Sequence, residues 1–152
     1  MTSINEDIWL NRLSFLEKKY SKRDAFILLD ADYPIYTDTF QYMAGIQVYK
    51  KSEYTENFLI KLLNYSSDKR IITDAPNTQG FPNYKEFIEN RHDQTVLSIL
   101  IKKFIFSNLN KNKTKASDIN KMYYFKPKSF CIYRKLSFKS YYELRNKCKE
   151  LV

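Results

Sequence analysis

Hydrophobic residues recur at helical spacing near the start of the chain. Asp7 precedes a run whose apolar side chains lie mostly three or four positions apart, at Ile8, Trp9, Leu13, Leu16 and Tyr20. Lys18 and Lys19 lie near the end of this run, where they suit the negative end of a helix dipole. An aspartate cap followed by this spacing predicts a helix from Asp7 to Tyr20.

Residues 21–29 allow two interpretations. Ser21 precedes Asp24 by three positions, which is the spacing of a capping box and predicts a short helix ending at Leu29. The apolar run from Phe26 to Leu29 would equally suit a short buried strand, because periodicity does not separate the two in so few residues. Pro34 and the polar stretch 37–39 then predict a loop.

A strand and a helix are predicted next. Residues 44–49 alternate as a strand does, and Ser52 follows as a helix cap with Glu53 and Glu56 in the first turn. The apolar face of this helix is formed by Tyr54, Phe58, Leu62 and Tyr65. The two elements together form a β-α unit.

The segment from Asp74 to Asn83 has no periodicity and predicts a long loop. It contains two prolines, a glycine and two asparagines. Loops of this length are typical of ligand binding. Asn83 lies three residues before Glu86 and predicts a short helix, and Asp93 begins a stronger one whose broad apolar face is formed by Val96, Leu97, Leu100, Ile101 and Phe104.

Composition favours one folded, helix-rich α/β body over an all-β one. The 152 residues are 43% hydrophobic and include 25 Phe, Tyr and Trp, but only two glycines and four prolines, too few for many tight hairpins. Cys131 and Cys148 form no C-x-x-C motif and predict reduced thiols. The chain has no long apolar run and no signal-like N-terminus, so we expect a cytoplasmic protein.

Positive charge is concentrated in the last third of the chain. Residues 1–101 carry 12 Lys and Arg against 14 Asp and Glu, whereas residues 102–152 carry 14 against 3. We therefore expect a body of residues 1–106 and a basic extension of residues 107–152, with a strand at 130–133 and a final helix capped by Ser140. Such a segment suits an anionic membrane surface, a polyanionic substrate or nucleic acid, and a solvated lysine-rich face is the alternative. No nucleic-acid-binding motif accompanies it, which disfavours nucleic acid.

The most suggestive polar cluster is Arg91-His92-Asp93-Gln94, between the long loop and a buried helix. Helix N-termini favour anions and orient the groups of their first turn, and His92 is the single imidazole of the chain. The alternative is structural: Asp93 caps the helix, Gln94 is solvated and His92 is a packing residue.

Three blocks of sequence, one of which contains this cluster, carry a family resemblance. They are Ile72 to Asn77, Gly80 to Tyr84, and Arg91 to Leu100, with Phe87 between the second and the third. Together they resemble bacterial glycosyltransferases of polysaccharide and surface-glycan loci. Similar residues lie upstream at Trp9, 22–26, Thr39, Gln41, Ala44, Gly45 and Lys50, so that the resemblance covers about residues 9–104.

A wider resemblance is to retaining galactosyl- and glucosyltransferases of the GT-A fold. Met43-Ala44-Gly45-Ile46 is similar to their small-residue strand, and Asp93-Gln94-Thr95 to their Asp-Gln-Asp motif. The resemblance implies the helix-rich C-terminal half of that nucleotide-diphospho-sugar transferase fold. Met43 and Thr95 depart from the pattern, in which an asparagine and a second aspartate stand at these positions.

The same resemblance implies roles for particular residues. Asp93 and Gln94 would be the catalytic pair, Asp93 on the donor-sugar hydroxyls and Gln94 near the anomeric carbon. The substrate-binding residues would be Arg91, His92, Ala44, Gly45, Asn77 and Asn83, of which Asn77 and Asn83 face the acceptor. Asp30 and Asp32 form an Asp-x-Asp pair that is similar to the site of a divalent metal, Mn or Mg, in such enzymes.

Two hypotheses follow from the resemblance. The first is transfer of a hexose from a nucleotide sugar to a glycan or lipid-linked glycan at the inner membrane face, with the basic extension on the membrane. The second is a non-catalytic remnant or accessory subunit, because only 29 residues precede Asp30, and a partner chain would then supply the nucleotide-binding half. A basic nucleic-acid-binding module is a third alternative.

Overall fold

The segment predicted as the first helix is a strand. The structure, a computed structural model, describes residues 2–5, 7–107 and 115–117, and in it Ile8–Leu16 forms strand β2. β2 pairs with strand β3, Phe40–Tyr49, and the side chains of Ile8 and Leu10 in β2 are completely buried. The carboxylate of Asp7 caps no helix and accepts a hydrogen bond from Ser52 Oγ at 2.7 Å. The predicted first helix is therefore wrong, because pairing with a distant strand outweighs the helical spacing of the apolar residues.

The sheet has three antiparallel strands in the order β1-β2-β3, with β1 at Thr2–Asn5. The predicted strand at 44–49 is confirmed and is longer than expected. Its pairing is irregular: Leu10 lies opposite Gln47, but Arg12 lies opposite Tyr42, so β3 has three more residues than β2 between these pairs. The extra residues form a bulge that contains Ala44 and Gly45.

Three short helices lie between strands β2 and β3. After α1, Glu17–Tyr20, the structure contains α2, Arg23–Leu28, so the helical interpretation of this segment is confirmed. The predicted cap is wrong, because Lys22 occupies the N-cap position and makes no side-chain capping bond. The loop predicted around Pro34 is partly helical, since Pro34–Thr37 forms α3 with proline at its start.

Helix α4, Glu53–Ser66, confirms the prediction made from Ser52. The Ser52 hydroxyl accepts from Thr55 N, and the Thr55 side chain closes a capping box. Helix α5, Lys69–Ile72, follows, and the long loop after it is confirmed, but residues 83–86 form only a turn. The helix predicted to start at Asn83 is therefore wrong.

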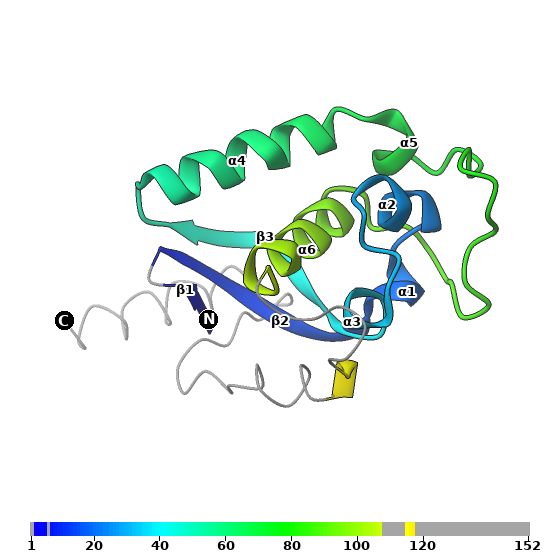
Figure 1. Cartoon of the computed structure of the whole chain (residues 1–152), viewed down its shortest axis with the longest axis horizontal. Helices are drawn as coiled ribbons and strands as arrows, with labels where there is room; N and C mark the ends of the chain where they lie inside the picture. The colour runs from blue at the N-terminus through cyan, green and yellow to red at the C-terminus, as the bar shows by residue number, and fades with distance from the viewer. Residues whose placement is uncertain (1, 6, 108–114, 118–152) are drawn as a thin grey trace, which may run out of the picture.

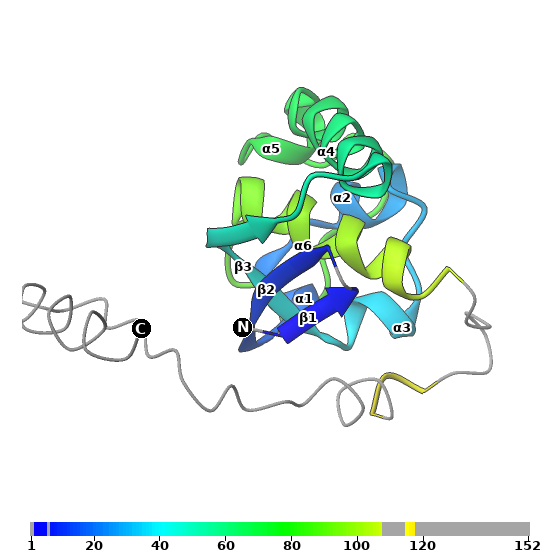
Figure 2. The ribbon, with the colours of Figure 1, turned by 90° about the vertical axis from the view of Figure 1, so that its left-hand side faces the viewer.

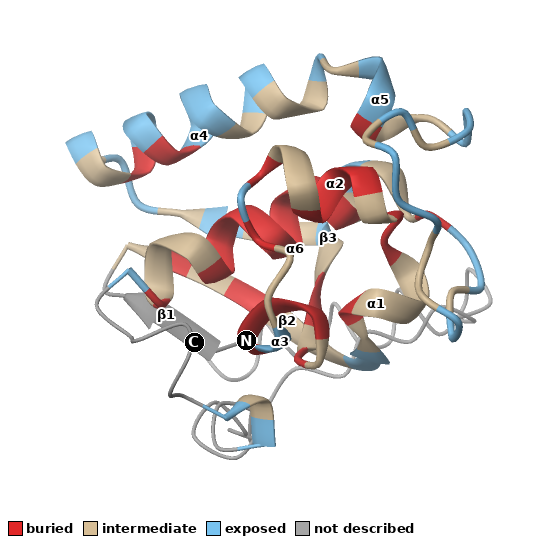
Figure 3. Ribbon diagram, turned by 45° about the vertical axis from the view of Figure 1, so that its right-hand side comes forward, coloured by how far each residue is buried: buried red, intermediate tan, exposed pale blue. Residues whose placement is uncertain are grey.

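Helix α6, His92–Ile105, lies between the sheet and α4 (Figures 1 and 2). Its residues 95–102 are all buried, and the deepest part of the molecule runs along α6 and α2 (Figure 3). Because α6 is covered on several sides, its apolar residues form a broad face rather than a single stripe, as the sequence predicted. The mixed, helix-rich α/β character predicted from the sequence is confirmed.

Three sequence predictions lie outside the described residues: the strand at 130–133, the helix after Ser140 and the two cysteine thiols. The same holds for most of the basic extension, of which residues 107 and 115–117 are described. Within the described part of the chain, no helix has the length and apolar character needed to cross a membrane.

Candidate functional site

The first turn of α6 is positioned by backbone contacts. Arg91 is the N-cap residue and makes no side-chain capping bond, while its N–H donates to Tyr20 O at 3.1 Å and its carbonyl accepts from Gln94 N at 2.9 Å. Asp93 therefore lies inside the first turn rather than at the cap. Its carboxylate is exposed, and among the described residues none donates a hydrogen bond to it. A carboxylate so placed is available to hydroxyl groups of a ligand.

Arg91 points towards the sheet side of this turn. Its guanidinium carbon lies 4.6 Å from the centre of the Phe15 ring and 4.3 Å from that of Tyr20. Its Nε donates to Glu89 Oε1 at 3.0 Å. These contacts hold the loop to α1, so they give Arg91 a structural role beside the predicted substrate-binding one.

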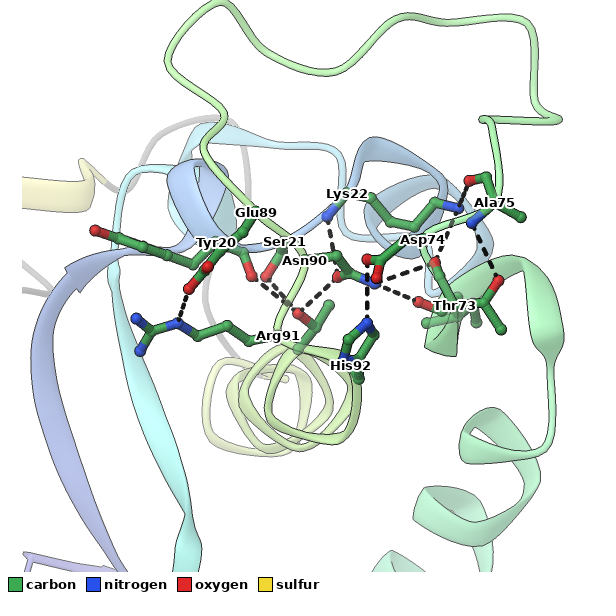
Figure 4. Close-up of polar contacts among 12 residues, drawn as sticks. Tyr20, Ser21, Lys22, Thr73, Asp74, Ala75, Glu89, Asn90, Arg91 and His92 are labelled. Atoms are coloured by element: carbon green, nitrogen blue, oxygen red, sulfur yellow. Dashed lines mark hydrogen bonds and ion pairs between the residues drawn. The ribbon is translucent and has the colours of Figure 1, made fainter.

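His92 turns the chain from the loop into the helix. Its φ of 42° lies in the left-handed region, which is uncommon for a residue other than glycine. Its Nε2 lies 3.1 Å from Asp74 Oδ1, and both side chains are substantially exposed (Figure 4). The pair connects the start of the long loop to the start of α6.

A cavity of about 400 Å³ lies beside this pair, lined mainly by Lys22, Asp74, Asn83, Phe87, Asn90 and His92. Lys22 is only 2% exposed, and its ammonium donates to Ala75 O at 2.6 Å and Thr73 O at 3.4 Å (Figure 4). The Asn90 amide is fully engaged, because it bonds backbone groups of Lys22, Ile71 and Thr73 as well as the Thr95 hydroxyl. The lining is mostly polar, with Phe87 and Ile88 as its larger apolar side chains.

The loop itself is fixed by buried polar groups. Asp24, which is fully buried, accepts from Thr78 N at 2.6 Å, Thr78 Oγ1 at 2.9 Å and Gln79 N at 3.2 Å. Asn83 Oδ1 accepts from Arg23 N at 2.8 Å and Asn77 Nδ2 at 2.9 Å. The two residues predicted to bind the glycan acceptor, Asn77 and Asn83, are therefore hydrogen-bonded to each other.

Gln94 lies on the other side of α6, against the bulge in β3. Its Nε2 donates to Gln41 Oε1 at 2.8 Å, and its Oε1 accepts from Ala44 N at 3.5 Å. Gly45 is exposed, and a Cβ atom placed on it would meet only the Met43 side chain, at 3.9 Å or more. The structure thus brings Ala44, Gly45 and Gln94 together and leaves open space over the glycine.

Asp30 and Asp32 have structural partners. Asp30 follows α2 with φ 49°, its N–H donates to Ile27 O at 3.0 Å, and Ala31 N donates to Phe26 O at 2.7 Å. These two bonds form a Schellman motif in which Asp30 occupies the left-handed position that glycine usually fills. Asp32 accepts from Arg23 at 3.1 Å and from the hydroxyl of Tyr84. Burial raises the pKa of the Tyr84 phenol, and its bond to Asp32 raises it further, so this hydroxyl stays protonated and donates.

The structure does not bring Asp30 and Asp93 together. Asp30 Oδ2 lies 3.7 Å from Lys103 Nζ, and Lys103 is ten positions after Asp93 in α6, which corresponds to about 15 Å along the helix axis. No three His, Cys, Asp or Glu side chains among residues 2–5, 7–107 and 115–117 lie close enough to hold a metal ion. Beside the cavity, two side chains of these types lie together, His92 and Asp74.

Asp30→Gly should stabilise the protein, because glycine adopts a positive φ without the steric cost that a side chain brings. We expect a gain of about 0.5–1 kcal/mol in the free energy of unfolding, reduced slightly by loss of the exposed contact to Lys103. Thermal unfolding followed by circular dichroism measures it. Asp38→Gly is the matched control, since Asp38 also follows a short helix and pairs with a lysine but has φ −98°. A loss of stability in both variants would contradict the assignment of Asp30.

The sequence did not indicate that the polar residues which hold this region are buried. Lys22, Asp24, Gln41 and Asn90 are all at most 7% exposed, yet each belongs to a type that is usually found on the surface. The one local signal was polar residues within the apolar run of α6, Thr95, Ser98 and Lys102, which the structure places against Ser21 and Glu17.

Comparison with known proteins yields no relative: no protein-family model, no curated protein and no solved structure matches the chain.

Proposed function

We propose that this chain carries the sugar-binding part of a glycosyltransferase that transfers a hexose from a nucleotide sugar to a glycan acceptor. The observation behind the proposal is the contact between the bulge of β3 and the first turn of α6. There Ala44 and Gly45 lie beside Gln94, while Asp93 has an exposed carboxylate in the same turn. A bulge often bends a strand and redirects its side chains next to a binding site, and a glycine there leaves space for a ligand.

In this proposal the donor sugar lies over Gly45. The carboxylate of Asp93 accepts hydrogen bonds from sugar hydroxyls, and Gln94 faces the ring. The acceptor extends across the first turn of α6, with its attacking hydroxyl beside the donor sugar and its remaining part in the cavity between His92 and Asn83. The amide nitrogen of Asn83 and the carboxylate of Asp74 supply donors and acceptors for its hydroxyl groups.

A second candidate function is an accessory subunit that holds the sugar while another chain binds the nucleotide. The specific observation is that both carboxylates of the Asp-x-Asp pair already have partners within the protein. Asp32 is bonded to Arg23 and Tyr84, and Asp30 follows the end of α2 and lies near Lys103. In this version the divalent metal and the diphosphate are held by the partner chain.

Gly45→Val tests the proposed donor site. Valine suits a strand, and its Cβ atom meets only the Met43 side chain, at 3.9 Å or more, so the melting temperature should stay within about 2 °C of that of the wild type. Its branched side chain occupies the space over the bulge, so binding of a uridine diphosphate hexose should weaken by about tenfold or more, measured by calorimetry with and without manganese. Val48→Leu, at an exposed position of the same strand, is the control and should bind as the wild type does.

The same titrations separate the two candidates. Free hexoses that bind as tightly as nucleotide sugars, and lose binding in Gly45→Val, indicate the accessory subunit. Absence of saturable binding by any nucleotide sugar or free sugar contradicts both.

A further inference from the structure

A buried chain of hydrogen bonds connects the carboxylate of Glu17 to Gln94. Glu17 is fully buried, and its Oε2 accepts from Ser98 Oγ at 2.7 Å and from the ammonium of Lys102. Its Oε1 accepts from Ser21 Oγ at 2.8 Å and from Gln41 Nε2 at 3.0 Å. An ionised carboxylate accepts hydrogen bonds and donates none, so every group facing Glu17 must present a hydrogen to it.

This requirement fixes the orientation of the Gln41 amide. Gln41 is fully buried, and its Nε2 faces Glu17 Oε1, Tyr20 O at 3.2 Å and Ser21 Oγ at 3.1 Å. Rotation of the amide by 180° would direct its carbonyl oxygen at the carboxylate and at the Tyr20 carbonyl. Such unpaired acceptors are costly in a buried site. Gln41 therefore keeps its nitrogen towards Glu17 and its oxygen towards Gln94.

The orientation of Gln94 follows from that of Gln41. Because Gln41 presents an oxygen, Gln94 must donate its Nε2, and the two atoms lie 2.8 Å apart. The carbonyl oxygen of Gln94 is then directed at β3, where Ala44 N approaches it to 3.5 Å. The carboxylate of Glu17, together with the Tyr20 carbonyl, thus determines through two amides which atom of Gln94 faces the bulge.

We propose that Glu17 and Gln41 are positioning residues, which hold the carbonyl oxygen of Gln94 towards the Ala44–Gly45 bulge. The proposal deepens, and rests on, the sugar-binding function proposed above. A carbonyl oxygen accepts a hydrogen bond from a sugar hydroxyl, and its partial negative charge stabilises positive charge that develops on a sugar ring. The site thereby selects ligands that present a donor or an electron-poor carbon at this point.

A double-mutant cycle tests the positioning without any ligand. Gln94→Glu replaces the amide by a carboxylate that faces Gln41 Oε1, and Gln41 is held by Glu17, so we expect the melting temperature at pH 7 to fall by about 5 °C or more. In the background Glu17→Gln with Lys102→Met the charge is absent, so that rotation of the Gln41 amide is opposed by the Tyr20 carbonyl alone. There Gln94→Glu should lower the melting temperature by about 2 °C at most.

Gln94→Met is the matched control, because it removes the amide without adding a charge and should have the same effect in both backgrounds. Equal losses for Gln94→Glu in the two backgrounds would overturn the proposal. Nuclear magnetic resonance of the wild type gives a second measurement that requires no folded variant. The side-chain amide hydrogens of Gln94 should exchange with solvent at least about tenfold more slowly than those of the exposed Asn57 side chain. Equal exchange rates also contradict the proposal.

The cycle separates this inference from the proposed function. A clear coupling between positions 17 and 94, together with no sugar binding in the calorimetric titrations, would retain the positioning and reject the glycosyltransferase. Sugar binding that is lost in Gly45→Val, together with no coupling, would reject the positioning alone.

Discussion

Lys102→Met is expected to lower the free energy of unfolding by about 3–5 kcal/mol, because it leaves the buried carboxylate of Glu17 without a counter-charge. Lys102 is 1% exposed and its ammonium contacts Glu17 Oε2 directly. Burial lowers the pKa of Lys102, and the neighbouring carboxylate of Glu17 offsets part of that shift. Urea unfolding followed by the fluorescence of Trp9, the only tryptophan, measures the loss.

The paired variant Glu17→Gln with Lys102→Met should recover most of this stability. Glutamine keeps the shape of the glutamate and its bonds to Ser21 and Ser98, and methionine keeps the apolar stem of the lysine. Lys51→Met, at a side chain that is 91% exposed, is the control and should unfold as the wild type does. If the paired variant were as unstable as Lys102→Met alone, the loss would have to come from packing rather than from the unpaired charge.

Asp24→Ala is expected to release the loop between residues 74 and 83 and to lower the free energy of unfolding by about 2–3 kcal/mol. The carboxylate of Asp24 is the shared acceptor for Thr78 N, Thr78 Oγ1 and Gln79 N, and hydrogen bonds to a buried charged group are among the stronger ones. Hydrogen exchange read by mass spectrometry should show faster exchange at Thr78 and Gln79, while the amides of α6 remain protected.

Asp24→Asn should lower the free energy of unfolding by less than Asp24→Ala does, because its amide oxygen still accepts from Thr78. Some stability should still be lost, because the amide nitrogen then faces the N–H of Gln79. Glu86→Ala removes a carboxylate from the same connection between α5 and α6, where it forms an exposed ion pair with Lys18. It is the control and should leave both the melting temperature and the exchange of the loop unchanged. Unchanged exchange at Thr78 in Asp24→Ala would contradict the role assigned to this carboxylate.

These two variants concern residues whose importance the sequence did not reveal. Glu17 and Lys102 are 85 positions apart, and Asp24 and Thr78 are 54 positions apart. Periodicity and capping rules describe neighbours within a few positions, so they carry no information on such pairs. The polar positions inside the apolar run of α6 were visible, but their partners were not.

The errors at the start of the chain have the same origin. The apolar residues at Ile8 and Trp9 suit a helix by spacing and a strand by type, and pairing with the distant β3 decides between them. Asp93 had the sequence signature of a helix cap, yet the N-cap is Arg91, two residues earlier, where the N–H of Arg91 donates to the distant Tyr20 O. The bulge around Gly45 likewise depends on the register between two strands.

The sequence by itself determined the elements that local contacts specify: α4 with its Ser52 cap, the buried helix α6, the strand ending at Tyr49, and the irregular loop after Asp74. Each depends on backbone hydrogen bonds and apolar spacing within one segment, which residue types encode directly. Only the tertiary structure decided that Gln94 faces the bulge of β3 and His92 the loop, on opposite sides of one helix turn. The direction of a side chain there depends on charges such as that of Glu17, which act through space and leave no periodic trace in the sequence.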